Sequence, residues 1–535
     1  MPTLDWIGKQ AVVNHHREVP YRLIHCDSDL SAGDSDAGNL LVQGDNLQAL
    51  RALLPYYAGK VKCIYIDPPY NTGNEGWVYN DNVNSSEIRK WLGEVVGKES
   101  EDLSRHDKWL CMMYPRLRLL REFLREDGVI FVSIDDNEQP NLSQLMIEIF
   151  GGRNFLANIA VQKRYSRENR GDIGDAHEYV TVFAKNSLAM RGTFNRVPLD
   201  EKQAAVYRNP NNDPRGRWRA VPMTAQGFRP NQMYEIETPT GRKLKPPKGR
   251  CWSTIEPEFL KLKEAGRIYF GKDGSSAPGI IRYLSEVEGL VAWTWWPHED
   301  AGHTDEAKKE VLALGLDFDT PKPTRLIKRI LEISSGPNDL ILDSFSGSGT
   351  AGHAALQLNA NDGGSRRFIL VEMEEAIARD VTAERLRRVI KGYNKGGDPD
   401  KPVEGLGGGF RYCHLGAPLF DEFGDIASEV RFSDLAAHIF FAETGVPIPE
   451  KAASEFLGVH QDRAVYLLFD EASAHTPREA AGNVLTPDRL SRLPEQPAGF
   501  EGVRVVYAEG CTVSAGRLKA AGVTFKQIPY QVEGV

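Results

Sequence analysis

Four consecutive residues, Asp67-Pro68-Pro69-Tyr70, combine a carboxylate, a fixed backbone and an aromatic ring directly after the apolar run 64–66. β-branched and aromatic residues favour a buried strand, and two prolines cannot continue one. We therefore expect Asp67 at the carboxyl end of a strand, where open α/β sheets bind ligands. Such a pocket suits an exocyclic amine on a planar base, because the two N–H donors need two acceptors and the ring needs a stacking face. A strand that merely ends at prolines beside an incidental Asp explains these four residues equally well.

A second stretch, residues 339–352, leads from an apolar strand into Gly347-x-Gly349-x-x-Gly352. A helix is predicted over 350–358, starting at Thr350, and a further strand over 367–371 ends at Glu372. This order is typical of dinucleotide-type sites, in which glycines let the backbone approach the ligand and the acid holds ribose hydroxyls. A Walker loop is excluded, because no Lys follows the last glycine.

Asp343 stands just ahead of these glycines and indicates which adenosyl ligand would bind. A carboxylate at this point suits an amino-acid ammonium and is awkward for a pyrophosphate. S-adenosylmethionine therefore fits better than NAD. With the amine pocket at 67–70, the sequence places a methyl donor and a methyl acceptor on one sheet, which makes incidental explanations of the two motifs jointly improbable.

The composition is that of an ordinary folded protein, with 535 residues, 41% hydrophobic and 26% charged, enough for two to four domains. No apolar run approaches the roughly 18 to 20 residues of a membrane span, and no signal-peptide pattern opens the chain, so we expect a cytoplasmic protein that does not contact membranes. The six cysteines are scattered without a C-x-x-C pair, so neither a zinc site nor a disulfide framework is predicted.

The net charge of −9 is unevenly distributed. Residues 161–250 hold 18 Lys and Arg against 9 Asp and Glu, whereas residues 401–535 hold 12 against 18. A locally positive segment is what a phosphate backbone requires, although a solvated basic face would have the same composition.

Five segments follow from the hydrophobic pattern. Residues 1–39 are predicted to be an N-terminal extension with little regular structure. The strand, helix and strand at 39–43, 47–54 and 62–66 read as a parallel β-α-β unit, and further elements at 109–125, 128–135, 142–150, 158–164 and 179–184 complete a first half at 40–184. Between them, 71–104 is predicted to hold a loop over the pocket that carries Tyr79 and Asn80.

The second half of the same sheet is predicted at 321–392, and the two halves flank an insert at 185–320. The insert interleaves basic and aromatic residues, and at this length it is better explained as a module than as a structureless loop. After a glycine-rich linker, 410–535 is predicted to be a small α/β domain with strands at 464–469, 503–507 and 523–528. Its acidic charge favours partner contact or dimerisation over DNA binding, with plain stabilisation of the fold as the alternative.

In the order D-P-P-Y, then F-x-G-x-G (345–349), the chain resembles the β class of amino-group DNA methyltransferases. The resemblance implies a Rossmann-like α/β sheet with circularly permuted motifs and an inserted target-recognition domain. The segment 320–327 resembles the family's element before the glycine loop, which places Lys322 beside the cofactor. D-P-P-Y rather than S-P-P-Y implies adenine N6 over cytosine N4. More closely, 67–74, 127–138, 177–180 and 525–530 resemble the modification subunit of type III restriction-modification systems.

The resemblance also implies roles for the motif residues and partners for the chain. Tyr70 would stack on a base flipped out of double-stranded DNA, while the Asp67 carboxylate and the Pro68 carbonyl accept the amino hydrogens. Glu372 would hold the ribose, Asp343 the amino-acid end of the cofactor and Phe345 the adenosyl pocket. Asp45 would border the site or simply cap a turn. A restriction (helicase-nuclease) subunit and a second copy of the chain are the expected protein partners, and no metal is expected.

Two rival functions stay open at this point. One is methyl transfer to another acceptor, such as RNA, a protein amide or cytosine N4. The other is a catalytically silent subunit that reads DNA for a nuclease partner. The recognition sequence cannot be read from the insert, because the same side-chain types contact phosphates and bases.

Overall fold

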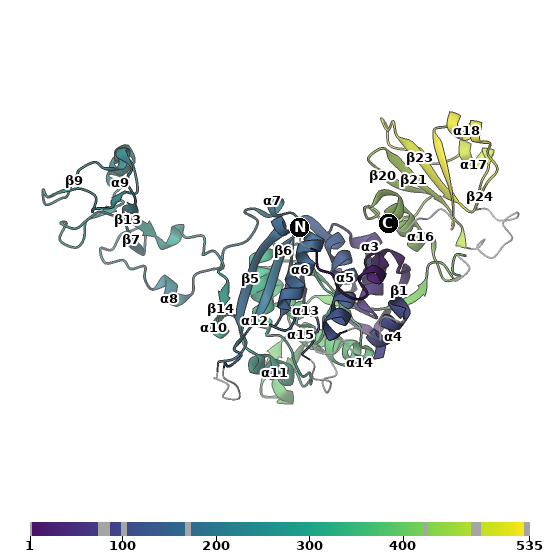
Figure 1. Ribbon diagram of the computed structural model, residues 1–535, viewed down its shortest axis with the longest axis horizontal. Helices are drawn as coiled ribbons and strands as arrows, with labels where there is room; N and C mark the ends of the chain where they lie inside the picture. The colour runs from purple at the N-terminus through teal and green to yellow at the C-terminus, as the bar shows by residue number, and fades with distance from the viewer. Residues whose placement is uncertain are drawn as a thin grey trace. The chain divides into compact units, whose positions relative to one another are not determined.

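The computed structural model describes residues 3–72, 86–97, 104–165, 173–421, 425–471 and 483–528. The chain forms two compact units (Figure 1): one combines the residues up to Asn195 with those from Trp293 onward, and the other is Arg196–Ala292. The predicted loop with Tyr79 and Asn80 lies outside the described residues, and so do the last two residues of the 525–530 motif.

A ten-stranded sheet in the order β1-β19-β2-β16-β15-β3-β4-β6-β5-β14 forms the centre of the first unit. The block from β19 to β4 is parallel, whereas β6 runs antiparallel to both β4 and β5. The α/β sheet predicted from the sequence is thereby confirmed. The strands are β1 Arg22–Gly33, β2 Leu40–Gln43, β3 Val61–Ile66, β4 Leu124–Ile134, β5 Phe155–Gln162, β6 His177–Ala184, β14 Trp295–Trp296, β15 Leu340–Asp343, β16 Arg367–Glu372 and β19 Gly409–Pro418.

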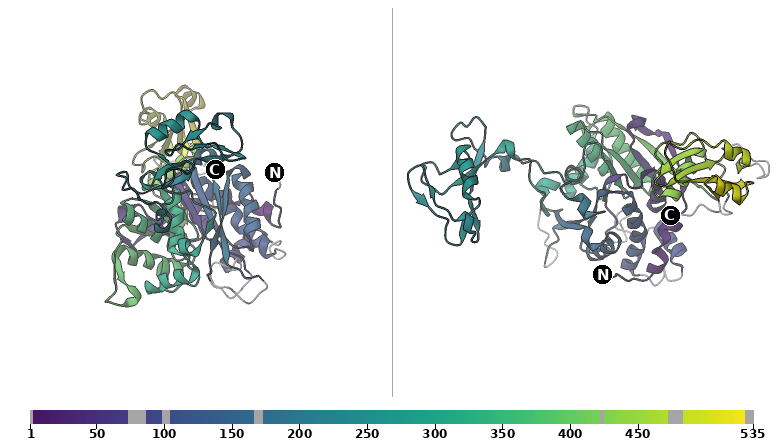
Figure 2. Two further views of the ribbon diagram at one scale, coloured as in Figure 1. Left: turned by 90° about the vertical axis from the view of Figure 1, so that its left-hand side faces the viewer. Right: turned by 90° about the horizontal axis from the view of Figure 1, so that it is seen from above.

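Helices cover both faces of this sheet (Figures 1 and 2). Strand β3 is buried along its whole length, as expected for a strand covered on both faces. Ile64 and Ile66 pack into the core that contains α3 and α5, whereas Cys63 faces α12, where the Ser334 hydroxyl lies 3.2 Å from its sulfur. The layers are α3 Asn46–Tyr57, α5 Arg105–Phe123 and α6 Gln139–Phe150 on one face, and α12 Thr324–Ser334, α13 Thr350–Asp362 and α15 Glu384–Lys391 on the other.

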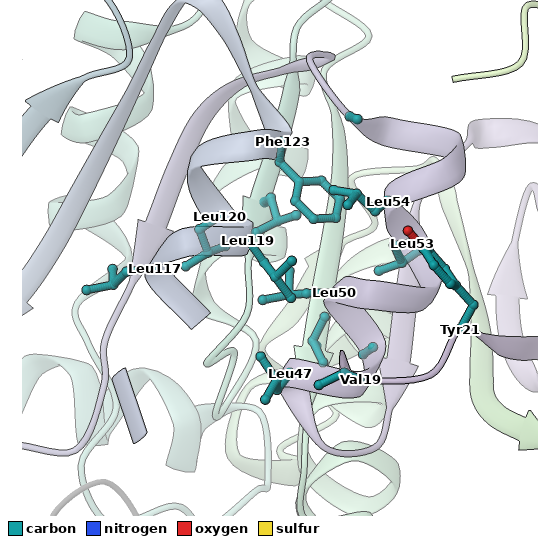
Figure 3. Close-up of a cluster of buried hydrophobic side chains, with 14 of the residues drawn as sticks. Val19, Tyr21, Leu47, Leu50, Leu53, Leu54, Leu117, Leu119, Leu120 and Phe123 are labelled. Atoms are coloured by element: carbon teal, nitrogen blue, oxygen red, sulfur yellow. The ribbon is translucent and has the colours of Figure 1, made fainter. Parts of the chain in front are cut away.

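The interface of α3 and α5 shows why these two segments form helices (Figure 3). Their leucines recur three and four residues apart, so each helix presents one apolar face. The packed side chains include Leu47, Leu50, Leu53 and Leu54 of α3 and Leu117, Leu119, Leu120 and Phe123 of α5. The Ser104 capping box fixes where α5 begins, which in turn places its first turn beside the residues after Asp67.

The prediction that residues 1–39 lack regular structure is wrong. Two short helices, α1 Lys9–Val12 and α2 His15–Glu18, precede β1, which pairs antiparallel with β19 at the edge of the main sheet. The alternation in β1 is weak and its residues are largely polar, because it is an edge strand whose pairing partner lies almost 400 residues further along the chain.

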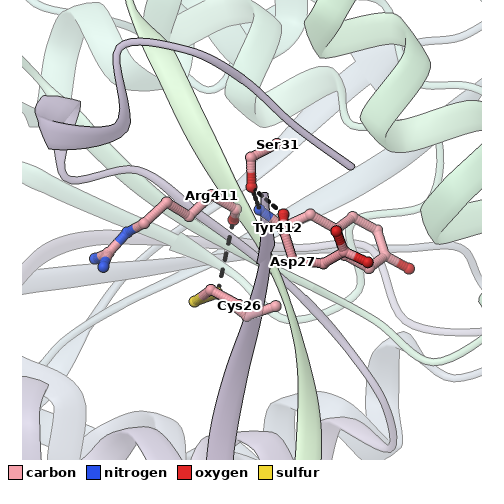
Figure 4. The surroundings of a disulfide bond; sticks show 6 residues. Cys26, Asp27, Ser31, Arg411 and Tyr412 are labelled. Atoms are coloured by element: carbon pink, nitrogen blue, oxygen red, sulfur yellow. Dashed lines mark hydrogen bonds between the residues drawn. A yellow bond between two sulfur atoms is a disulfide. The ribbon is translucent and has the colours of Figure 1, made fainter. Parts of the chain in front are cut away.

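The expectation of no disulfide is also corrected. Cys26 of β1 and Cys413 of β19 stand opposite each other in the ladder and form a disulfide bond across a sequence separation of 387 residues. Figure 4 shows the surroundings of the bond, where the Ser31 hydroxyl accepts a hydrogen bond from the Tyr412 amide. No local spacing in the sequence could indicate this pair, because only the pairing of the two strands brings the cysteines together.

The second unit is narrower than the predicted insert at 185–320, since residues from Trp293 onward, including β14, belong to the first unit. Its own core contains Met223, Trp252 and Phe259. Trp218 is buried, whereas the neighbouring Arg217 and Arg219 are exposed. The elements are α8 Glu201–Ala204, β7 Trp218–Pro222, β8 Thr224–Gln226, β9 Ile236–Glu237, β10 Lys243–Leu244, β11 Arg250–Trp252, α9 Glu256–Glu264, β12 Ile268–Tyr269 and β13 Gly279–Tyr283.

The predicted C-terminal domain at 410–535 begins too early, because β19 belongs to the main sheet. The following helix α16 Phe432–Thr444 packs its apolar residues into the main core. A separate four-stranded sheet then forms in the order β20-β21-β23-β25, with bounds β20 Phe456–His460, β21 Arg463–Leu468, β23 Val503–Ala508 and β25 Val523–Gln527. Within the described part of the chain, no helix is long and apolar enough to cross a membrane.

Candidate active site

Asp67 lies where the sequence predicts it, immediately after β3 and buried at the carboxyl edge of the sheet. Two contacts hold the loop that follows. The Trp109 indole N–H of α5 donates to the Pro69 carbonyl at 2.7 Å, and the Asn71 amide donates to Glu138, whose side chain is fully buried. Asn71 has a φ of 57°, a conformation that Asn tolerates better than most residues. The loop is therefore fixed from α5 and from the turn before α6.

Lys322 brings the Asp67 loop together with β6. Its ammonium donates to both carboxylate oxygens of Glu178 at 3.0 Å each, lies 3.3 Å from Asp67 Oδ1 and donates to the Tyr70 hydroxyl. The same nitrogen lies 4.6 Å from the centroid of the Tyr70 ring, a cation–π contact. The Tyr70 hydroxyl in turn donates to Glu178 at 3.2 Å. Two carboxylates, one ammonium and one ring form a single cluster.

Burial governs the protonation of this cluster. It raises the pKa of Asp67 to about 6; Lys322 opposes that rise and Glu178 adds to it. Burial by itself would lower the pKa of Lys322, but the Asp67 and Glu178 carboxylates raise it above its ordinary value. Lys322 is therefore charged near neutral pH, and Asp67 changes its protonation just below it.

The glycine loop lies on the neighbouring strand, because β15 and β3 pair directly. Gly347 and Gly349 have φ values of 48° and 78°, which L side chains rarely adopt. A Cβ on Gly349 would come within 2.9 Å of the Thr382 methyl group. Thr350 begins α13, and its hydroxyl donates to the Lys322 carbonyl at 3.3 Å. The loop thus connects the glycine motif to the segment that carries Lys322.

Asp343 ends β15 and is almost fully buried. Its carboxylate accepts the Phe345 amide at 3.0 Å, and within the described ranges no Lys, Arg or His pairs with it. Burial raises the pKa of Asp343 well above its usual range, and the Asp67 and Glu372 carboxylates raise it further. A buried carboxylate in this condition favours a cationic ligand.

The other two acids expected at the site are engaged with backbone and side-chain groups. Glu372 accepts the Gly347 amide at 2.9 Å and the Glu374 amide at 3.0 Å, so it supports the glycine loop. Asp45 caps α3 through the Gln48 amide and pairs with Arg116 at 3.0 Å. The Asp45 carboxylate therefore caps a helix, and its place beside the cofactor stays a prediction.

Two cavities in the first unit meet at the site. One, of about 550 Å³, is lined by Asp67, Tyr70, Glu178 and the basic and aromatic residues 163–165. A smaller one lies under the glycine loop against Asp343, Phe345, Gly347 and Thr350. Asp67 and Lys322 line both cavities. We expect Lys322 on the cofactor side. Its ammonium group contacts Tyr70 and Glu178, which line the larger cavity.

Arg385 is a residue that sequence reasoning missed. It lies on α15, is fully buried, and donates to the Ser348 and Thr350 hydroxyls at 2.9 Å and to the Thr324 hydroxyl at 3.0 Å. Burial lowers its pKa to about 10. Its charge would have suggested an exposed position, since helix α15 carries several other basic residues.

Glu178 lies within the motif at 177–180, and its place at the site could have been predicted from the sequence. Strand β6 is antiparallel to β4, so it begins at the edge where the parallel strands end. An acid at the second residue of such a strand therefore faces the same ligand edge as Asp67. The signal was the expected strand pair, combined with a carboxylate at the start of an apolar run.

The site and fold define an α/β enzyme class in which a glycine loop for an adenosyl-type ligand and an acceptor pocket lie on adjacent strands. A family described as DNA methylase matches residues 61–384, and the chain belongs to this family. The Mod subunit of the type III restriction-modification enzyme StyLTI from Salmonella typhimurium is 36% identical over 409 residues, covering 73% of this chain and 60% of the relative.

Two further relatives agree with this assignment. The EcoPI Mod subunit of Escherichia phage P1 is 30% identical over 522 residues, 84% of this chain and 75% of the relative. The type II methyltransferase M.KpnI of Klebsiella pneumoniae is 32% identical over 406 residues, 68% of this chain and 90% of the relative. The predicted resemblance to DNA methyltransferases and type III modification subunits is confirmed.

Proposed function

We propose that this protein is a site-specific DNA methyltransferase that transfers a methyl group from S-adenosylmethionine to adenine N6, as the modification subunit of a type III-like restriction or phage-defence system. The observation that carries the proposal is that Asp67 lines both cavities, so that an acceptor amine and a donor would meet at one carboxylate. Membership of the DNA methylase family supports it.

The residues around the smaller cavity fit the proposed cofactor. Asp343 is a buried carboxylate with a raised pKa, which suits the amino-acid ammonium. Phe345 and Gly347 line this cavity, and with Gly349 in the same loop they would face the adenosyl part. Glu372, which accepts the Gly347 amide, would meet the ribose hydroxyls. When bound, the cofactor supplies an electrophilic methyl group on a sulfonium.

The residues of the larger cavity would hold the acceptor base. A base inside a duplex cannot reach this edge, so it must flip out of the stack. Tyr70 would stack on it, and the Asp67 carboxylate and the Pro68 carbonyl would accept its amino hydrogens. Trp109 already occupies the Pro69 carbonyl, so Pro69 fixes the loop. Orientation and fixed dipoles would then supply most of the rate.

The remaining parts of the proposal rest on arrangement and charge. The acceptor strand β3 precedes the donor strand β15 in the chain although the two are neighbours in the sheet, which supports a permuted motif order. Exposed Arg217 and Arg219 support Arg196–Ala292 as the DNA-reading module. The names of the relatives support a restriction subunit as partner, and we expect a homodimer in solution.

The test is single-molecule sequencing of DNA from cells that express this chain alone or its Asp67→Ala variant. We expect N6-methyladenine in one short motif with the intact chain and none with the variant, while the purified variant still binds DNA containing the motif. Methylation of a single strand would support the type III assignment. N4-methylcytosine would overturn the choice of base, and loss of both methylation and binding in Asp67→Ala would make that carboxylate structural.

A further inference from the structure

The Lys322 ammonium occupies the place where an acceptor amine would bind. It is a nitrogen donor 3.3 Å from Asp67 Oδ1, and it also donates to the Tyr70 hydroxyl, at the edge of the ring on which the base would stack. A base that stacks on Tyr70 must bring its amine to the same carboxylate that Lys322 contacts. The base amine and the ammonium therefore compete for Asp67, and Lys322 has to move away from Asp67 Oδ1 before an amine can donate to that oxygen.

Glu178 gives the displaced lysine a partner. Two contacts of 3.0 Å join Lys322 to Glu178, against one contact of 3.3 Å to Asp67. An ammonium that lost Asp67 without another carboxylate would be left as an unpaired buried charge, which is costly. With Glu178 in place, the lysine keeps its two shorter contacts and gives up the longer one.

Charge balance leads to the same conclusion. The cluster holds two buried carboxylates and one ammonium. Were Lys322 to leave altogether, the two carboxylates would face each other uncompensated, and one would take up a proton. Retention of Lys322 on Glu178 keeps Asp67 ionised and able to accept an amino hydrogen.

We propose that Glu178 is a positioning residue that draws the Lys322 ammonium off Asp67, so that the flipped base can take its place. This rests on the proposed function, because it assumes that Asp67 receives the acceptor amine. Glu178 then acts through Lys322, and its removal should turn the lysine into a competitor of the substrate.

The test is a double-mutant cycle on the full-length chain. Glu178→Gln keeps the size of the side chain and an acceptor for the Tyr70 hydroxyl but removes the charge that holds Lys322. We expect single-turnover methyl transfer from radiolabelled S-adenosylmethionine to unmethylated genomic DNA to fall about 30-fold, within the range of energies measured for coupled neighbours. Adding Lys322→Met should restore the rate to within about fivefold of the original chain, because the competitor is gone.

The controls separate this idea from a structural role and from failure of the proposed function. Glu148→Gln removes a comparable 3.0 Å ion pair, with Lys9, far from the cluster and should leave the rate unchanged. Cofactor affinity and the thermal unfolding temperature should be the same in Glu178→Gln and the original chain. A double variant no faster than Glu178→Gln, or a fully active Glu178→Gln, would overturn the proposal. An original chain that transfers no methyl to DNA would instead overturn the proposed function.

Discussion

Asp67 and Asp343 are two buried carboxylates at the ends of neighbouring strands, yet the protein treats them differently. Asp67 has an ammonium from its own chain, Lys322, within 3.3 Å. Asp343 accepts a single backbone amide, from Phe345, and no cationic side chain of the described residues pairs with it. Burial raises the pKa of both, to about 6 for Asp67 and well above the usual range for Asp343.

The difference indicates which kind of ligand group each carboxylate would bind. Asp67 already has a donor that must be exchanged for a neutral amine, so a donor meets its carboxylate both before and after substrate binds. Asp343 lacks compensation until a cation arrives, so the protein gains most at this point from a charged ligand. Asp67 would exchange one hydrogen-bond donor for another, whereas Asp343 would bind a cationic ligand.

The largest effect is expected from replacing Asp343, which tests whether the two carboxylates have different roles. Asp343→Asn should weaken S-adenosylmethionine binding about 100-fold, because the ligand's ammonium would lose a buried carboxylate that has no cationic partner among the described residues. Asp67→Asn, the matched change on the adjacent strand, should alter that affinity less than about threefold. Titration calorimetry of the two variants measures both. Equal losses would mean that the carboxylates do not divide their roles in this way.

The pH dependence sharpens the comparison at Asp67. Because its pKa is raised to about 6, the carboxyl group stabilises the fold at low pH and this contribution is lost as pH rises from about 4 through 6, an effect of about 3 kcal/mol. Methyl transfer needs the ionised form, so kcat/KM should rise about tenfold between pH 5 and 6.5 and then level off. Asp67→Asn should unfold at a higher temperature than the original chain at pH 8, and at nearly the same temperature at pH 4. A stability difference that grows toward low pH would contradict the assignment.

Substitution of Arg385 tests how strongly cofactor binding depends on the hydrogen bonds that this side chain makes around the glycine loop. Arg385→Lys keeps the charge but cannot reach the Ser348, Thr350 and Thr324 hydroxyls at once. We expect cofactor affinity to fall about fivefold. Arg388→Lys on the same helix, which changes a half-buried pair with Glu384, is the matched control and should have no effect. Equal effects of the two changes would indicate general damage to α15.

The smallest expected effect concerns the disulfide, which touches neither carboxylate. Replacing Cys26 and Cys413 by Ser should leave methyl transfer within about twofold and lower the thermal unfolding temperature by about 2 to 5 °C. Cys511→Ser, at a free cysteine, is the control. A loss of activity equal to that of Asp343→Asn would mean that the pairing of β1 with β19 controls the geometry of the active site.

Local chemistry allowed the centre of the molecule to be predicted. Asp67 and Asp343 each follow a short apolar strand and precede residues that cannot extend it, so their positions depend on neighbours in sequence. Strands β3 and β15 were predicted for the same reason, and fully covered strands carry continuous apolar runs.

The parts that escaped prediction depend on distant contacts. The cluster of Lys322 with Glu178 joins residues 144 positions apart, and no spacing rule links them. Strand β1 is rich in polar residues, so the sequence predicts an irregular extension here. The ladder hydrogen bonds with β19, which the local sequence does not indicate, hold it in the sheet. Arg385 can be buried because four polar partners from two other helices and the glycine loop contact it, namely Ser348, Thr324, Thr350 and His353.

The pairing of β1 with β19 also bears on how the chain folds as it is made. The sheet is contiguous only when β19 lies between β1 and β2, and Cys413 of β19 follows Cys26 of β1 by 387 residues. At roughly 5 to 20 residues per second, a ribosome needs about 20 to 80 s to cover that distance. For this period β1 and the edge of β2 are unpaired strand edges, open to wrong pairing or to a chaperone. The last parallel strand to emerge therefore decides when the catalytic sheet is complete.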